Sequence, residues 1–271
     1  MIPENIIEDA IAYTKKYLPN FQNPKTIQEK IAWLKTFDIT DLKTNCTDKL
    51  KLHDYSKKIL GIDLCVPVIK IYKTIEDIDL EKLPNKFVFK CNHGCKYNFI
   101  VKNKKSFDFN EVKRRITSWM NTNFGLKGYE LQYYGIERKI YAETYINTKK
   151  EDLIDYKFLC FNGKPTYIQI ISDRSKDTKR LNYYDIDFKF VDISRKEFPN
   201  NKDILDKKPE HFEAMIEYAK LLSKPFSFVR VDFYDIDGRV YLGELTFSPG
   251  NAKMKYENEE HSMMLGNMLK L

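Results

Sequence analysis

Cysteine and histidine are scarce in this chain, and long apolar runs are absent from it. The 271 residues include five cysteines at irregular positions and four histidines. The cysteine pattern argues against a disulfide scaffold and favours reduced thiols. Cys91, His93 and Cys95 lie close together, but no second Cys/His pair stands nearby to complete a tetrahedral zinc site, so we expect no zinc there.

The apolar stretches are all shorter than the roughly 20 residues of a membrane span, and no charged leader followed by an apolar segment opens the chain. We therefore expect a cytoplasmic protein without a membrane span. Lysine and arginine number 46 against 39 aspartate and glutamate, a net charge of +7, and the two signs interleave. Nucleic-acid-binding proteins usually concentrate their basic residues, so we expect no nucleic-acid partner. The positive surplus suits a small anionic substrate.

The hydrophobic pattern changes from helical to strand spacing along the chain. Residues 1–65 have the spacing that is typical of helices. A capping box at Thr26 and Glu29 marks the start of the second helix. Strands follow, interrupted by helical spacing over 110–123 and after Pro209. The strongest hairpin-turn signals are Asn162-Gly163 and Asp237-Gly238. This order predicts an α+β fold with antiparallel sheets.

The last predicted hairpin carries the most informative residues. A period of two places Arg230 and Asp232 on one face of its first strand, and Leu242, Glu244 and Thr246 on one face of its second. Carboxylates that share a face at the roughly 5–8 Å spacing of neighbouring strands can share a cation. Mg²⁺ takes oxygen ligands from one or two carboxylates plus phosphate. The competing interpretation is a salt-bridged sheet surface, in which each pair adds only about 0–1 kcal/mol.

Whether the two carboxylates meet depends on the turn. A regular two-residue turn at Asp237-Gly238 would place Glu244 on the opposite face from Asp232. The flanking sequence instead favours a three-residue loop with the glycine in the left-handed region. We predict that register, which pairs Arg230 with Glu244 and Asp232 with Leu242.

Short stretches from about Thr47 to Gly250 resemble the ATP-grasp superfamily in their order and spacing, and more closely its TupA-like branch, associated with bacterial surface-polysaccharide and teichuronopeptide synthesis. The stretches are Asp48-Lys49, 83–90, 91–94, 142–145, 155–158, 161–165, 172–174, 230–232 and 243–247. The resemblance implies an ATP-grasp fold in three parts. These are a helical segment over 1–65, a first subdomain with a lysine and a phosphate loop over 66–145, and a second subdomain with a magnesium hairpin over 146–271.

The resemblance also implies ATP and Mg²⁺ as cofactors and assigns the nucleotide site by position. Lys90 would hold the ATP phosphates, and His93 and Gly94 would open the loop that folds over them. The inter-lobe hinge would contact adenine, with Glu143 accepting a hydrogen bond from the amino group. The hinge residues are Glu143, Thr144, Tyr145 and Ile146.

The catalytic and metal-binding roles follow in the same way. Lys157 would face the nucleotide, and Arg174 and Arg230 would brace the transferred phosphate and the acyl-phosphate. Asp232, Glu244 and Thr246 would ligate Mg²⁺. The sequence departs from the family pattern at Thr246, where the superfamily often has Asn. It departs again after Lys90, where the loop has no second glycine.

The implied reaction joins a carboxylate to an amine through an acyl-phosphate. By analogy the carboxylate would belong to a uronic acid of a surface polysaccharide or its precursor, and the amine to an amino acid or related compound. Other functions stay open. A kinase on the same scaffold would phosphorylate a sugar hydroxyl, with Asp173 as a candidate base. A glycosyltransferase of the same pathway, or a module that only binds glycan or nucleic acid, would not consume ATP.

Overall fold

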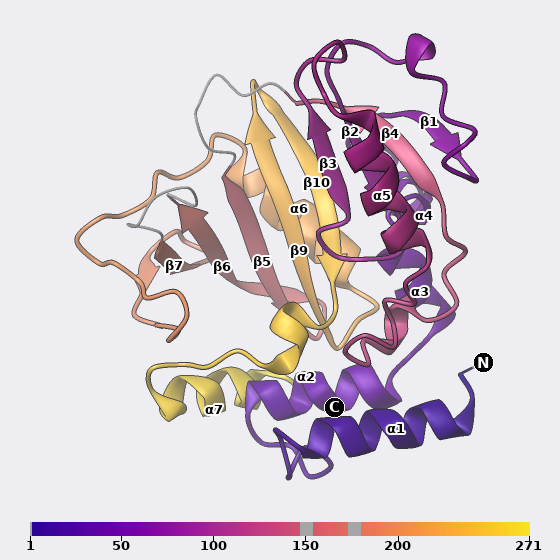
Figure 1. Cartoon of the computed structure of the whole chain (residues 1–271). Coiled ribbons are helices and arrows are strands. Elements are labelled where there is room, and N and C mark those ends of the chain that lie inside the picture. Colours follow the sequence, from indigo (N-terminus) through magenta and orange to yellow (C-terminus); the bar gives the residue numbers. More distant parts are fainter. Residues whose placement is uncertain (1, 147–153, 173–179) are drawn as a thin grey trace.

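The computed structural model describes residues 2–146, 154–172 and 180–271 (Figure 1). Helices open the chain, as predicted, and the second begins with the predicted capping box between Thr26 and Glu29. The last of them ends at Gly61, whose φ of 73° lies in the left-handed region that glycine adopts at helix ends. These helices are α1 (Glu4–Lys15), α2 (Ile27–Phe37), α3 (Asp41–Thr47) and α4 (Lys51–Leu60).

The first sheet has four antiparallel strands in the order β1-β4-β2-β3. Helix α5 packs against it through Val112 and Ile116, which are fully buried with Phe87 and Phe89 of β2. The elements of this part are β1 (Val68–Tyr72), η1 (Leu80–Lys82), β2 (Phe87–Cys91), β3 (Asn98–Val101), α5 (Phe109–Met120), η2 (Leu131–Tyr133) and β4 (Ile140–Thr144).

The second sheet has six described strands in the order β10-β9-β5-β6-β7-β8, with every neighbouring pair antiparallel. Helix α6 covers one face of it, and α7 lies beside α2 at one end (Figure 1). The elements are β5 (Asp155–Phe161), β6 (Lys164–Ser172), β7 (Arg180–Asp185), β8 (Phe190–Val191), α6 (Phe212–Ser223), β9 (Phe228–Ile236), β10 (Arg239–Thr246), η3 (Pro249–Ala252) and α7 (Glu259–Met268). Together the two sheets confirm the α+β prediction.

Strand β5 is buried along its whole length, and its alternation separates two apolar layers. Phe158 and Cys160 pack in the layer under α6, whereas Leu159 and Phe161 pack with residues of α2 and α7 on the opposite face. Lys157 points to that opposite face as well. None of the helices in the described ranges is long and apolar enough to cross a membrane.

The hairpin β9-β10 turns differently from our prediction. Arg239 pairs with Ile236, so the loop has two residues, and both Asp237 (φ 48°) and Gly238 (φ 78°) are left-handed, as a type I′ turn requires. The predicted three-residue loop is therefore wrong, and so is the predicted pairing. Glu244 lies opposite Asp232.

A β-bulge at Gly243 brings the two carboxylates to one face in spite of the two-residue turn. The register shifts between Leu242 and Glu244, which places Leu242 in the core under α6 and Glu244 on the opposite face. The prediction that these two residues share a face is thus wrong. Glycine is needed at the bulge because a Cβ on Gly243 would lie 2.9 Å from the ring of Tyr234.

Two glycines at the same turn position provide a test of backbone strain. Gly163 and Gly238 both have positive φ, but a Cβ on Gly163 would lie 3.0 Å from the backbone of Lys224, whereas one on Gly238 would meet nothing within 4 Å. We expect Gly238→Ala to lower the free energy of unfolding by about 1 kcal/mol, and Gly163→Ala by about 2–3 kcal/mol. Urea denaturation measures both, and equal losses would contradict the contact with Lys224.

Candidate functional site

Strands β9 and β10 bring four of the predicted side chains into one hydrogen-bonded group. Arg230 donates to both oxygens of Asp232, from Nε to Oδ1 and from Nη2 to Oδ2, each at 2.7 Å. Its Nη2 also donates to Glu244 Oε1 at 3.2 Å and to Thr246 Oγ1 at 3.1 Å, and the threonine hydroxyl donates to Glu244 at 2.9 Å. The guanidinium therefore ties the two strands together on the face away from α6.

Lys157 joins this group from the neighbouring strand β5. It pairs in register with Asp232, and its Nζ forms an ion pair with that carboxylate and lies 3.6 Å from Asp155 Oδ1. The side chains of Lys157 and Asp232 are only 9% and 2% exposed. A buried charge of this kind needs a partner, and each of these residues supplies one to the other.

Glu244 is the carboxylate of the group that solvent reaches. Its side chain is 33% exposed, against 13% for Arg230. Burial alone would raise the pKa of Glu244, but Arg230, Lys49 and Lys157 outweigh it and lower the pKa to about 2. Glu244 is therefore ionised at neutral pH. With Asp232 and the hydroxyl of Thr246, it forms the hard oxygen donor set that suits Mg²⁺.

Two predicted residues meet on the first sheet as well. Lys90 on β2 forms an ion pair with Glu143 on β4. Both border a small cavity of about 40 Å³, whose far wall includes Tyr234 and Leu242 of the last hairpin. That volume holds about one or two waters and no purine, so a nucleotide could enter only if the two sheets moved apart.

Lys49 lies in the same cavity, and our sequence interpretation gave it no role. Its Nζ donates to the carbonyl of Gly94 at 2.7 Å. Burial lowers the pKa of Lys49, against the attraction of Glu244. The neighbouring Asp48 accepts from the side chain of Asn92 at 3.0 Å, which holds this segment against the loop after β2. The dipeptide Asp48-Lys49 belongs to the stretches that carry the family resemblance, so a sequence signal existed.

His93 lies apart from the charged group. It is 2% exposed, its Nε2 lies 2.9 Å from the carbonyl oxygen of Trp119, and its ring packs edge-on against Tyr97. Burial lowers the pKa of His93, so the ring is neutral at pH 7. The structure thus places His93 against α5, while Gly94 contacts Lys49 through its backbone.

The remaining predicted residues follow β4 or lie outside the described ranges. Thr144 ends β4, with its N–H donating to the carbonyl of Pro67 at 3.0 Å, and Tyr145 and Ile146 continue from it. Arg174 and Asp173 fall outside the described residues.

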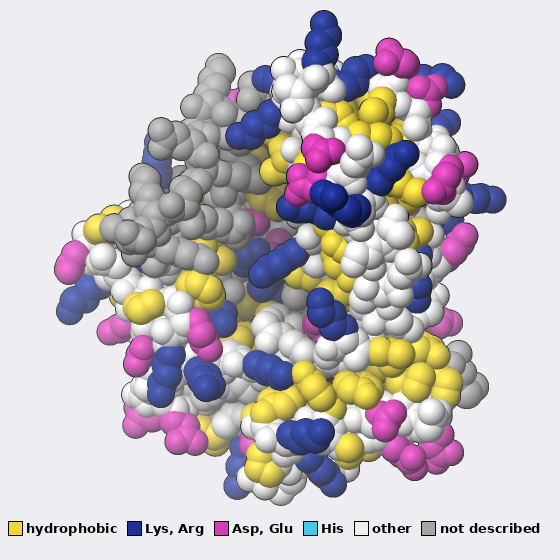
Figure 2. Space-filling view, viewed as in Figure 1, with side chains coloured by type: hydrophobic (Ala, Val, Ile, Leu, Met, Phe, Trp, Pro, Cys, Tyr) yellow, Lys and Arg dark blue, Asp and Glu magenta, His cyan; other side chains and the backbone are white. Residues whose placement is uncertain are grey.

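A large pocket lies against the hairpin group. Its volume is about 650 Å³, and it extends from Arg230, Glu244 and Thr246 to an aromatic wall that includes Tyr97 and Trp119. The central part of this face is hollowed, and lysine and arginine side chains gather around the hollow (Figure 2). Such a pocket is large enough for a sugar-sized or amino-acid-sized substrate beside the charged group.

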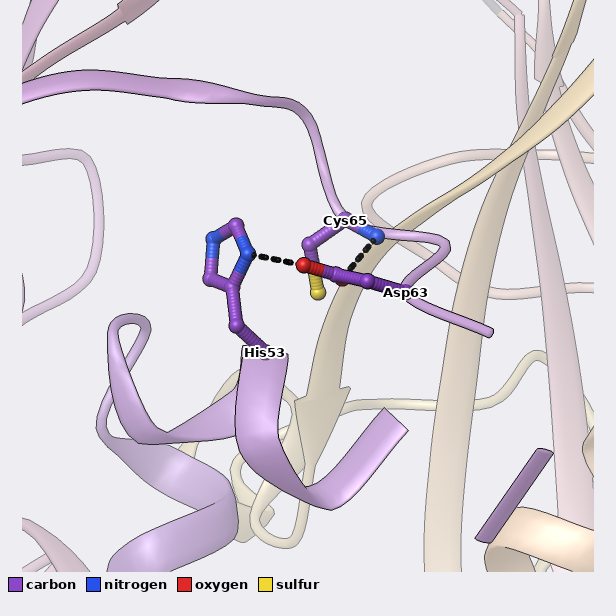
Figure 3. A group of neighbouring side chains, drawn as sticks. All are labelled: His53, Asp63 and Cys65. Carbon is purple, nitrogen blue, oxygen red and sulfur yellow. Dashed lines mark hydrogen bonds and ion pairs between the residues drawn. The ribbon is translucent and has the colours of Figure 1, made fainter. Parts of the chain in front are cut away.

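A third polar group consists of His53, Asp63 and Cys65 (Figure 3), of which His53 and Cys65 border the small cavity. Their donor atoms lie within 4.8 Å of one another, as metal ligands would. However, Asp63 already uses both oxygens, one 2.8 Å from His53 Nδ1 and the other accepting from the N–H of Cys65 at 2.9 Å. Burial also raises the pKa of the Cys65 thiol, which keeps it protonated. We interpret the group as a structural link between α4 and the segment before β1.

Comparisons with known proteins place the chain in a family. A family model described as TupA-like ATP-grasp matches residues 29–270. No curated protein matches. Similar solved structures include D-alanine–D-alanine ligase from Bacillus anthracis complexed with ATP, at 19% identity over 74% of this chain and 53% of that one, with a TM-score of 0.41.

Two further similar structures are also of ligases. The ATP-grasp ligase PsnB complexed with its minimal precursor is 10% identical over 80% of this chain and 59% of that one, with a TM-score of 0.42. Phosphoribosylamine–glycine ligase from Thermotoga maritima is 12% identical over 76% of this chain and 48% of that one, with a TM-score of 0.43. The chain thus spans about half to three-fifths of these proteins, and the family assignment stands on the family model. Because that model spans nearly the whole sequence, the chain belongs to the TupA-like ATP-grasp family.

Proposed function

We propose that the protein is an ATP- and Mg²⁺-dependent ligase that joins a carboxylate to an amine through an acyl-phosphate. The observation that carries the proposal is the group formed by Asp232, Glu244, Arg230 and Lys157 at the edge of a substrate-sized pocket. Two ionisable oxygen donors on one face, with cations beside them, are what the transfer of a phosphoryl group requires.

The nucleotide would lie between the two sheets. Lys90 and Lys49 border the small cavity from one side, and the hairpin closes it from the other. The lysines would hold the phosphates as point charges, and Glu143 would turn from Lys90 toward the adenine amino group. In this proposal the chain consists of a helical segment over 1–65, a first subdomain over 66–145 and a second subdomain over 146–271.

Asp232, Glu244 and Thr246 would hold Mg²⁺, which would neutralise phosphate charge when bound. The substrate carboxylate is already ionised, so it needs no base to attack the γ-phosphate. Arg230 would brace the transferred group with its planar fork, and its bonds to Asp232 and Glu244 fix that fork in place. An arrangement without a nucleophilic side chain is sufficient for this chemistry.

The pocket rim supports an anionic substrate. Lys96 and Lys127 are exposed at its edge. Together with the aromatic wall they would suit a sugar ring that bears a carboxylate, and we propose a uronic acid of a bacterial surface polysaccharide or its precursor. The reaction would take place in the cytoplasm, where ATP is available.

Trapping the activated acyl group tests the proposal. The protein is incubated with ATP, Mg²⁺, hydroxylamine and, in turn, glucuronic acid, galacturonic acid and their nucleotide-linked forms. We expect a hydroxamate, ADP and phosphate in equal amounts. A phosphomonoester would instead identify a kinase, and ADP formation that is independent of every carboxylate would contradict a ligase.

A further inference from the structure

Glu130 stands in the wall of the large pocket, just before η2, and no role in the proposed chemistry has yet been given to it. Its Oε2 accepts from the hydroxyl of Ser248 at 2.5 Å, and that hydroxyl accepts from Gln132 at 2.6 Å. Ser248 lies two residues after Thr246, the last residue of β10. The carboxylate is therefore fixed to the end of the strand that carries Glu244.

The charges of the pocket single out this carboxylate. Among the described residues that line it, the acidic ones are Glu130 and Glu244. Glu244 is engaged with Arg230, but no ion pair to Glu130 occurs in the described part of the chain. The nearby Lys35 directs its Nζ elsewhere, to Asn251 Oδ1 at 2.6 Å and to the carbonyl of Gly128 at 3.1 Å. Oε1 of Glu130 is thus available to a ligand.

The surroundings of Glu130 suit an organic cation. Tyr133, Trp119 and Phe124 line the same pocket, and the rings of Phe124 and Tyr133 meet edge to face at 4.8 Å. Aromatic faces attract ammonium groups, and they cover the carbon skeleton that bears them. A carboxylate that forms no ion pair within the described part of the chain, placed beside such a wall, suits the ammonium group of an amine.

We propose that Glu130 binds the ammonium group of the amine co-substrate and removes its proton before it attacks the acyl-phosphate. The proposal rests on the ligase function proposed above. It gives the pocket a direction, with the amine at the Glu130 end and the acyl-phosphate at the Arg230 end.

The proton balance of the second step requires such a group. An ammonium nitrogen has no lone pair, so one proton must pass to a base, here the Glu130 carboxylate, before the C–N bond can form. The C–O bond to phosphate then breaks, and phosphate leaves with the second proton. Each turnover converts the carboxylate, the ammonium and ATP into amide, ADP, hydrogen phosphate and one proton, which Glu130 returns to solvent.

The electrostatics of the site agree with this role. Burial raises the pKa of Glu130, against the hydrogen bond from Ser248 and the charge of Lys35, and Glu244 raises it further. A carboxylate with a raised pKa is a stronger base, and general bases contribute about 10²–10⁴-fold to rates.

Glu130→Gln tests the proposal, because glutamine keeps the size of the side chain and an oxygen that accepts from Ser248. Two rates are compared at pH 7. One is hydroxamate formation from hydroxylamine, which is neutral at this pH and needs no base. The other is amide formation from ammonium, the twenty amino acids and simple diamines. We expect the variant to form hydroxamate within about threefold of wild type and to lose about 10²-fold in amide formation.

The amide rate of the variant is also expected to recover as pH rises and the free amine becomes abundant, which a merely structural role of Glu130 would not cause. Glu137→Gln, at a side chain 73% exposed on the same segment, is the matched control and should change neither rate.

The outcomes separate the two proposals. If wild type forms no hydroxamate with any carboxylate, the ligase function itself fails, and the role of Glu130 with it. If wild type forms hydroxamate but no amide from any ammonium compound, the amine site is contradicted. The same holds if Glu130→Gln keeps both rates, or loses both equally.

Discussion

Glu244→Gln and Asp232→Asn are each expected to lower ATP turnover by about 10²-fold or more at neutral pH. Both substitutions keep the shape of the side chain but remove the negative charge that would hold Mg²⁺ against the phosphates. Glu244 is the cleaner position, because its side chain is 33% exposed and its replacement should leave stability nearly unchanged. Asp232 is 2% exposed and also pairs with Lys157, so its replacement costs some stability as well.

The matched control is Asp237→Asn, the same change in the turn of the same hairpin, at an exposed residue that lies away from the charged group. Asparagine is favoured at the left-handed positions of a type I′ turn, so this variant should fold and turn over ATP as wild type does. Turnover is measured well below the melting temperature of each variant, as Mg²⁺-dependent ADP release. Wild-type turnover in both Glu244→Gln and Asp232→Asn would refute the metal site.

Lys157→Met is expected to lower the free energy of unfolding by about 3 kcal/mol. Asp232 and Asp155, at 2% and 5% exposure, would lose a cation that lies between them. Removing one partner of a buried ion pair typically costs about 3–5 kcal/mol, and we expect the lower end because Arg230 still contacts Asp232.

A double-mutant cycle with Asp232→Asn isolates the pair. In the Asp232→Asn background, Lys157→Met no longer leaves the Asp232 carboxylate without its lysine partner. The double variant should therefore be more stable than the sum of the two single losses predicts. The free energies come from urea denaturation followed by circular dichroism. Additive losses would show that Lys157 and Asp232 do not interact.

The sequence predicts the faces of the strands better than their pairing. Alternation along β9 correctly places Arg230 and Asp232 together, because a strand has a fixed period of two. The length of the turn is harder to predict, because Asp237-Gly238 is compatible with loops of two or three residues. The bulge had a sequence signal in Gly243, as a glycine inside a strand often marks one. The requirement for glycine at this position arises from the ring of Tyr234, which lies against Gly243 only in the folded hairpin.

Residues that reach the site from distant segments could not be predicted by local pattern. Lys49 contacts the backbone of Gly94, 45 positions away, and Glu130 contacts Ser248, 118 positions away. No spacing rule connects such pairs, because these contacts depend on how separate parts of the fold pack together. His93 illustrates the converse. It is itself one of the residues predicted to open the phosphate loop, yet its ring is buried against α5.

The central claim is that the last hairpin, Lys90 of the first sheet and Lys49 of the helical segment together hold ATP and Mg²⁺. A crystal structure of the protein with Mg²⁺ and a non-hydrolysable ATP analogue tests it most directly. We expect the ion within about 2.0–2.1 Å of oxygens of Asp232 and Glu244, and the triphosphate against Lys90 and Lys49. An analogue bound away from the hairpin, with Arg230 still joined to both carboxylates and no ion beside them, would contradict it.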